Sequence, residues 1–135
     1  MSRVALPRRS LFAIAAAAWL AVRGGGSGLP AGEAALRALC SDLHCPRRLG
    51  QGCLKALPEH EPRSRFLTAA LFSDLPPAAR RATSARALAA MVRESSREDF
   101  RAGRIDTVDG WMLSRTETRL FALATLLEPE RSKGG

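Results

Sequence analysis

Prolines and glycines divide the chain from residue 32 onward into short segments, and this division limits the length of any element that can form. Within most of these segments the apolar residues recur three or four positions apart, which places them on one face of a helix. Alanine, leucine and arginine, all of which favour helices, are frequent. The sequence therefore predicts an all-α fold, a compact bundle of about five short helices in a single domain.

Helix ends are predicted from capping residues. Ser64 is an N-cap candidate for the third helix, and Thr83 or Ser84 for the fourth. Gly103 is expected to end the fourth helix, and Pro129 the last one. The expected buried faces are, in chain order, Ala35, Leu36, Leu39 and Leu43; Leu49, Cys53, Leu54 and Leu57; Phe66, Leu67, Ala70, Leu71 and Leu75; Leu88, Met91, Val92 and Phe100; and Leu120, Phe121, Leu123, Ala124 and Leu127.

One segment departs from the helical pattern. Residues 104–113 place β-branched and aromatic residues on both sides of Asp109-Gly110, a dipeptide that strongly favours a two-residue hairpin turn. Ser114 and Glu117 follow with the three-residue spacing of a capping box, in which each side chain binds the backbone N–H of the other residue. We therefore expect one small β-hairpin near residues 104–113, followed directly by the last helix.

The N-terminus has the organisation of an export signal. Arg3, Arg8 and Arg9 precede the apolar run Leu11–Val22, and a glycine-rich break follows it. This order of charge, apolar run and break is typical of a secretory leader. The run is short for a membrane span, so the membrane is expected as a partner only if the leader stays uncleaved.

Within this leader, Arg8, Arg9, Leu11 and Phe12 resemble the twin-arginine export motif, in which an arginine pair is followed by any residue and two apolar ones. The resemblance is limited to the signal. It implies a small exported bacterial protein that uses the twin-arginine machinery and resides in the periplasm or cell envelope.

The resulting organisation has three parts. Residues 1–31 form the export signal and glycine-rich linker, residues 32–129 the helical domain, and residues 130–135 a flexible tail.

The positive charge is divided by the same boundary. The chain carries 21 basic and 13 acidic residues, a net charge of +8, and four of the arginines but none of the acids lie in residues 1–31. Half of the excess therefore belongs to the leader, and the remaining bases alternate with acids along the helices. With two Trp and no Tyr, the chain also has few aromatic residues for base stacking, so no nucleic-acid partner is expected.

Three cysteines lie close together in the sequence. Cys40, Cys45 and Cys53 leave three interpretations open: a Cys40–Cys53 disulfide that joins the first two helices, buried free thiols, or a metal site completed by His44 and His60. The spacing matches no established zinc motif, so we expect neither a metal nor another cofactor.

No catalytic arrangement is evident. The chain has two histidines and lacks a nucleophile elbow and a phosphate-binding glycine loop, so it is not expected to be an enzyme. The acidic residues Glu98, Asp99, Asp106 and Asp109 do not follow the pattern of a calcium loop, and we expect them to serve in turns and ion pairs.

The segment 109–119 is the densest in chemical signals. Trp111, Arg115 and Arg119 are residue types that anchor protein interfaces, and they form the candidate partner interface. The alternative is that Trp111 packs against the end of the bundle. The sequence thus favours an exported accessory protein, a companion subunit of a larger envelope enzyme such as a redox enzyme. The competing hypothesis is a free-standing periplasmic helical domain that binds a small ligand or a metal through its Cys/His region.

Overall fold

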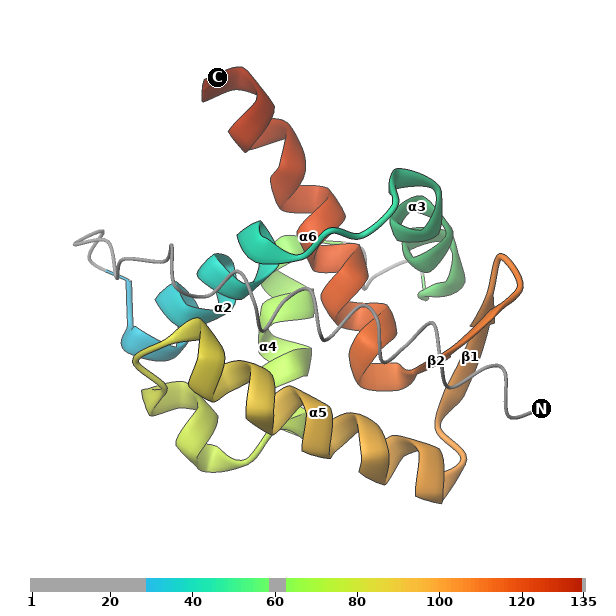
Figure 1. Cartoon of the computed structure of the whole chain (residues 1–135), viewed down its shortest axis with the longest axis horizontal. Helices are drawn as coiled ribbons and strands as arrows, with labels where there is room; N and C mark the ends of the chain where they lie inside the picture. Colours follow the sequence, from blue (N-terminus) through green and yellow to red (C-terminus); the bar gives the residue numbers. More distant parts are fainter. Residues whose placement is uncertain (1–28, 59–62, 135) are drawn as a thin grey trace.

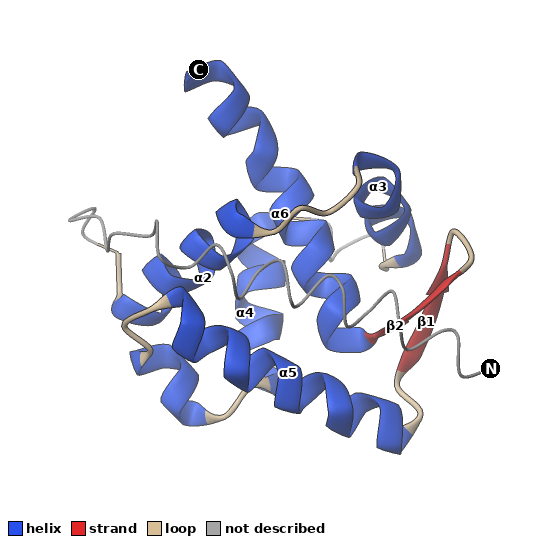
Figure 2. Cartoon of the chain, in the orientation of Figure 1, coloured by secondary structure: helices blue, strands red, loops and turns tan. Residues whose placement is uncertain are grey.

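The computed structural model of the chain describes residues 29–58 and 63–134. The fold is mainly helical with one small hairpin, which confirms the predicted fold class (Figures 1 and 2). The predicted leader residues Arg8, Arg9, Leu11 and Phe12 lie outside the described residues. The elements are α2 (Ala31–Asp42), α3 (Arg47–Ala56), α4 (Ser64–Asp74), the 3₁₀-helix η3 (Pro77–Arg81), α5 (Ala85–Ala102), β1 (Ile105–Val108), β2 (Trp111–Ser114) and α6 (Arg115–Gly134).

Helix α6 is the central element of the bundle. It contacts α2, α3, α4 and α5, and both hairpin strands also pack against it. Its first half supplies five consecutive buried residues, from Leu120 to Ala124. Figure 1 shows α6 crossing the middle of the molecule and its C-terminal end projecting beyond the other helices.

The ends of α5 are formed as the sequence predicts. The Ser84 hydroxyl accepts a hydrogen bond from the Ala87 N–H at 3.1 Å, which satisfies one of the unpaired donors of the first turn. At the other end Gly103 adopts φ of 78°, a left-handed conformation that costs glycine little. Its neighbour Arg104 donates its N–H to the Asp99 carbonyl at 2.8 Å.

The hairpin also matches its prediction. Val108 pairs with Trp111 across an Asp109-Gly110 turn, and both turn residues have positive φ, 51° and 84°, as a type I′ turn requires. Val108 and Leu113 are buried on the inner face of the hairpin. On the outer face Met112 remains exposed.

Two predictions for α4 are wrong. Arg63, in an extended conformation, occupies the N-cap position, and Ser64 is already the first helical residue. Phe66 is 47% exposed, whereas Leu67, Leu71 and Phe72 are buried. Phe66 and Phe72 are six residues apart, so they point about 120° apart around the helix and cannot both face the core.

The expected end of the last helix is also wrong. The backbone of α6 remains helical through Pro129 to Gly134. Proline removes one N–H from the ladder and crowds the preceding turn, which can kink a helix without ending it.

Among the described residues, no helix combines the length and the apolar character needed to cross a membrane.

Candidate functional site

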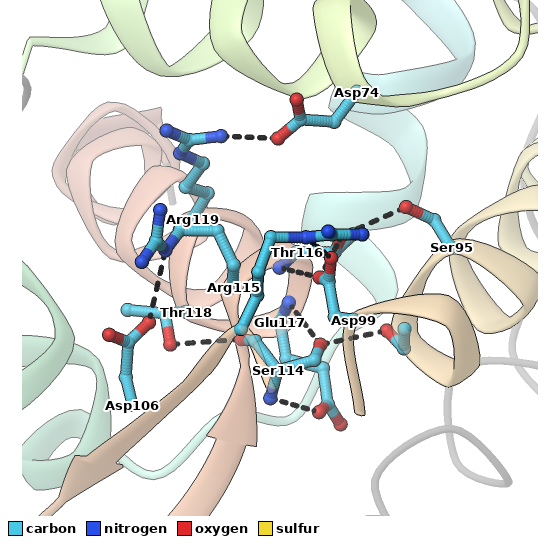
Figure 3. Close-up of polar contacts among 12 residues, drawn as sticks. Asp74, Ser95, Asp99, Asp106, Ser114, Arg115, Thr116, Glu117, Thr118 and Arg119 are labelled. Carbon is cyan, nitrogen blue, oxygen red and sulfur yellow. Dashed lines mark hydrogen bonds and ion pairs between the residues drawn. The ribbon is translucent and has the colours of Figure 1, made fainter. Parts of the chain in front are cut away.

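A buried polar junction joins α5 to the start of α6 (Figure 3). At its centre the Asp99 carboxylate, 3% exposed, accepts hydrogen bonds from the Thr116 N–H at 2.8 Å and from the Thr116 hydroxyl at 2.7 Å. Its other oxygen accepts one from Arg104 Nε at 2.8 Å. Thr116 lies in the first turn of α6, where N–H groups lack helical partners and the helix dipole favours negative charge. A carboxylate from α5 therefore completes the N-terminus of α6.

The predicted capping box forms the second part of the junction. The Glu117 N–H donates to the Ser114 hydroxyl at 3.0 Å, and the Ser114 N–H donates to Glu117 Oε2 at 2.9 Å. The Ser114 hydroxyl in turn donates to Ser96 Oγ on α5 at 3.0 Å. Ser96, Ser114 and Glu117 are all buried, so this network fixes the strand-to-helix turn inside the protein.

The three predicted interface residues border this junction. Trp111 is half-buried and packs against the core, which agrees with the alternative role considered for it. Arg119 forms an ion pair with Asp74 of α4, and its side chain is only 13% exposed. Arg115 Nε lies 3.7 Å from Asp106, with 41% of its side chain exposed. Of the three, Arg115 alone presents a large part of its side chain to solvent, and Figure 3 shows both arginines beside acidic partners.

The cysteines are free thiols, so the disulfide considered between Cys40 and Cys53 is not formed. Both side chains are buried within the apolar core, where each packs as a small apolar group on its own helix. Burial, reinforced by the charge of Glu128, raises the pKa of Cys45 to about 11. Burial and the neighbouring Cys45 thiol raise the pKa of Cys53 to about 12. Cys45 and Cys53 are thus protonated and unreactive at neutral pH.

The Cys/His region does not form a metal site in the part of the chain that the structure describes. There, no three His, Cys, Asp or Glu side chains are grouped so that they could hold a metal ion. His44 is exposed in the loop between α2 and α3, whereas Cys53 is buried in α3. The other candidate ligand, His60, lies outside the described residues.

A cleft of about 380 Å³ lies between α4 and the second half of α5. Two of its acids form ion pairs with arginines one helical turn away, and such a pair was expected for Glu98. Glu94 pairs with Arg97 at 3.1 Å, and Glu98 with Arg101 at 2.9 Å. Asp99 is held within the polar junction. Arg97 and Arg101 of α5 are therefore occupied by neighbouring carboxylates.

A larger groove of about 670 Å³ lies between α2, α4, η3 and α6; we call it the arginine groove. Its apolar lining includes the buried Leu36, Phe72 and Leu123, the half-buried Leu127, and the exposed Leu29 and Ala69. The wall formed by α4 carries small side chains, since Ser64, Thr68 and Ala69 lie between the larger residues. The described lining residues are Leu29, Pro30, Glu33, Leu36, Arg37, Ser64, Arg65, Thr68, Ala69, Phe72, Arg80, Leu123 and Leu127.

The rim of the arginine groove is basic. Arg37 of α2, Arg65 of α4 and Arg80 of η3 are exposed, and among the described lining residues Glu33 is the single acid. The guanidinium carbon of Arg80 lies 5.6 Å from the centroid of the Phe72 ring, within the range of a cation–π contact. This contact holds a positive charge directly above the apolar lining.

The backbone positions one end of this rim. A Cβ at Gly32 would lie 2.6 Å from the Arg80 carbonyl oxygen and 2.7 Å from that of Ala79. Glycine at this position therefore lets α2 approach the η3 backbone, which keeps Arg80 beside the first turn of α2.

The arginine groove is not evident from the sequence. Arg37, Arg65 and Arg80 belong to three separate segments, and no spacing rule connects them. Pro76 and Pro77 follow α4, and nothing in their sequence indicates that η3 returns the chain to α2. Phe72, which supports Arg80, was not expected to be buried.

Comparisons with known proteins give no match to this chain among protein-family models, curated proteins or solved structures. The surface and the leader motif are therefore the basis for inferring a function.

Proposed function

We propose that the protein is an exported, non-catalytic accessory protein that binds a larger protein partner in the periplasm or cell envelope through its arginine groove. The partner class implied by the leader resemblance is a larger exported enzyme, with redox enzymes among the candidates.

The observation that carries this proposal is the composition of the groove. Apolar side chains line the groove, and three exposed arginines, Arg37, Arg65 and Arg80, stand on its rim. Protein interfaces commonly combine an apolar centre with a polar margin, and arginine is enriched among the residues that contribute most to binding.

The experiment is affinity capture of the tagged full chain from the envelope fraction of its native host, with two matched variants. Arg65→Glu reverses a charge on the groove, while Arg63→Glu reverses an exposed charge two residues earlier that does not line it. We expect one stoichiometric partner with the wild type and with Arg63→Glu, and its loss with Arg65→Glu. A wild-type protein that is recovered as a monomer without a partner would contradict the proposal.

A second candidate function is a free-standing exported domain that binds a small ligand. The volume of the groove favours it, since about 670 Å³ lies within the usual range of small-molecule sites. On this hypothesis the ligand binds in the arginine groove, since the described residues of the Cys/His region form no group that could hold a metal ion.

A further inference from the structure

We propose that the partner element bound in the arginine groove is an amphipathic α-helix whose apolar face is flanked by carboxylates. This inference rests on the proposed function and specifies the chemistry of the partner at the same site.

The charge of the rim selects an acidic partner. Arg37, Arg65 and Arg80 come from three different elements, so the positive charge is distributed around the groove and not gathered at one point. A ligand with a single acidic head group can form ion pairs with only part of this rim, whereas a helix with several carboxylates can form ion pairs at several points along it. Guanidinium groups bind carboxylates in a bidentate geometry, which adds orientation as well as affinity.

The shape of α4 favours a helical partner. Arg65, Thr68, Ala69 and Phe72 follow the spacing i, i+3, i+4 and i+7, so they form one face of α4 along the groove. Thr68 and Ala69 are small and stand in the middle of this face. A second helix can approach closely at such a position and insert its larger apolar side chains between them.

The groove floor provides the apolar contact that such a helix needs. Leu36 and Leu123 are each 1% exposed, so they close the floor from below and offer little surface of their own. The accessible apolar contact comes from the exposed Leu29 and Ala69 and from the half-buried Leu127, and an apolar side chain of the partner would lie over these residues and lose its contact with water.

The chain's own N-terminal segment is a poor candidate for this occupant. Its basic residues Arg8, Arg9 and Arg23 are accompanied by no acid in the first 31 residues, so its charge has the same sign as the rim. Charge complementarity therefore points to another polypeptide.

The test uses a synthetic amphipathic helical peptide with leucines on one face and glutamates beside them, and a second peptide in which lysines replace the glutamates. Binding of each labelled peptide to the full chain is measured by fluorescence anisotropy at low and high salt. We expect the glutamate peptide to bind at low salt, more weakly at high salt, and the lysine peptide not to bind.

Two neighbouring variants locate the peptide. Arg80→Glu should raise the Kd of the glutamate peptide by about tenfold or more, and Arg81→Glu by less than about twofold. Both side chains are exposed on η3, but only Arg80 lines the groove. Circular dichroism of both variants checks that they fold.

Each other outcome overturns the inference. Equal effects of the two variants would place the peptide elsewhere, and equal binding of both peptides would remove the charge argument. Binding of decanoate, with no binding of the glutamate peptide, would favour the small-ligand function instead. If the glutamate peptide fails while Arg65→Glu still abolishes partner capture, the helical inference falls but the proposed docking function stands.

Discussion

Replacing Asp99 by asparagine tests whether the polar junction holds α5 to the start of α6. The change keeps the shape of the side chain but removes its charge and one acceptor oxygen. In the better orientation of the amide, the remaining oxygen still accepts from the Thr116 N–H and hydroxyl, which lie at 2.8 and 2.7 Å from the present carboxylate. The new NH₂ group then faces Arg104 Nε, which in the wild type donates to a carboxylate oxygen at 2.8 Å. Two donors then face each other, and this hydrogen bond is lost.

The cost follows from these contacts. A hydrogen bond to a charged group contributes about 1.5–3 kcal/mol, and loss of a negative charge at a helix N-terminus costs about 0.3–1 kcal/mol. Arg104 is 48% exposed and can turn toward water, which reduces the loss. We therefore expect Asp99→Asn to lower the free energy of unfolding by about 2–3 kcal/mol. Asp99→Ala, which leaves three donors without their acceptor, should lower it by about 4 kcal/mol.

Urea denaturation of the full chain, followed by circular dichroism, measures these changes. Glu98→Gln is the matched control, because it removes the neighbouring negative charge from an exposed ion pair with Arg101. Exposed pairs contribute little, so this variant should lose no more than about 0.5 kcal/mol. Equal losses in Asp99→Asn and Glu98→Gln would refute the role assigned to the junction.

Three further predictions concern packing and the thiols. Gly50→Ala would place a Cβ 1.9 Å from Thr125 Oγ1 and should destabilise the fold by about 1–3 kcal/mol in urea, and adding Thr125→Ala should recover much of that loss. In Gly32→Ala the new Cβ clashes with the Ala79 and Arg80 carbonyl oxygens, and because these are backbone atoms no side-chain rotation can relieve the clash. This variant should therefore have a lower thermal melting point than the wild type. An equal melting point would show that α2 is not held this closely to η3. Burial raises the pKa values of Cys45 and Cys53 above their ordinary value of 9.0, so the unfolded chain loses these protons first as the pH rises. The free energy of unfolding should therefore fall as the pH rises from about 9 to about 11 for Cys45 and to about 12 for Cys53, by up to about 1.4 kcal/mol per pH unit for each thiol. A Cys45→Ser variant with the wild-type slope would show that Cys45 does not contribute.

The parts of the fold that were predictable are those set by local chemistry. The Asp109-Gly110 turn, the Ser114–Glu117 capping box and the Gly103 helix end each depend on residues a few positions apart, and all three are confirmed. The reversal of Phe66 and Phe72 shows where local reasoning fails. Both are apolar, and the side of α4 that is buried depends on where α6 and η3 lie.

The same distinction applies to the candidate site. Arg119 is a candidate interface residue because it lies near Trp111 in the sequence. Its ion pair with Asp74 could not be predicted in this way, because the two residues are 45 positions apart. The arginine groove combines three arginines from separate segments, and η3 alone brings Arg80 to α2. Such arrangements depend on tertiary packing, and with no similar protein to compare, the sequence offered no signal for them.

The most direct test of the account fills the arginine groove without changing its charge. Ala69 is exposed at the centre of the α4 wall, and Ala90 is exposed on α5 away from the groove. The full chain with Ala69→Leu should keep the wild-type unfolding transition but lose the captured envelope partner, whereas Ala90→Leu should retain it. Equal capture by the two variants would show that the arginine groove is not the docking surface.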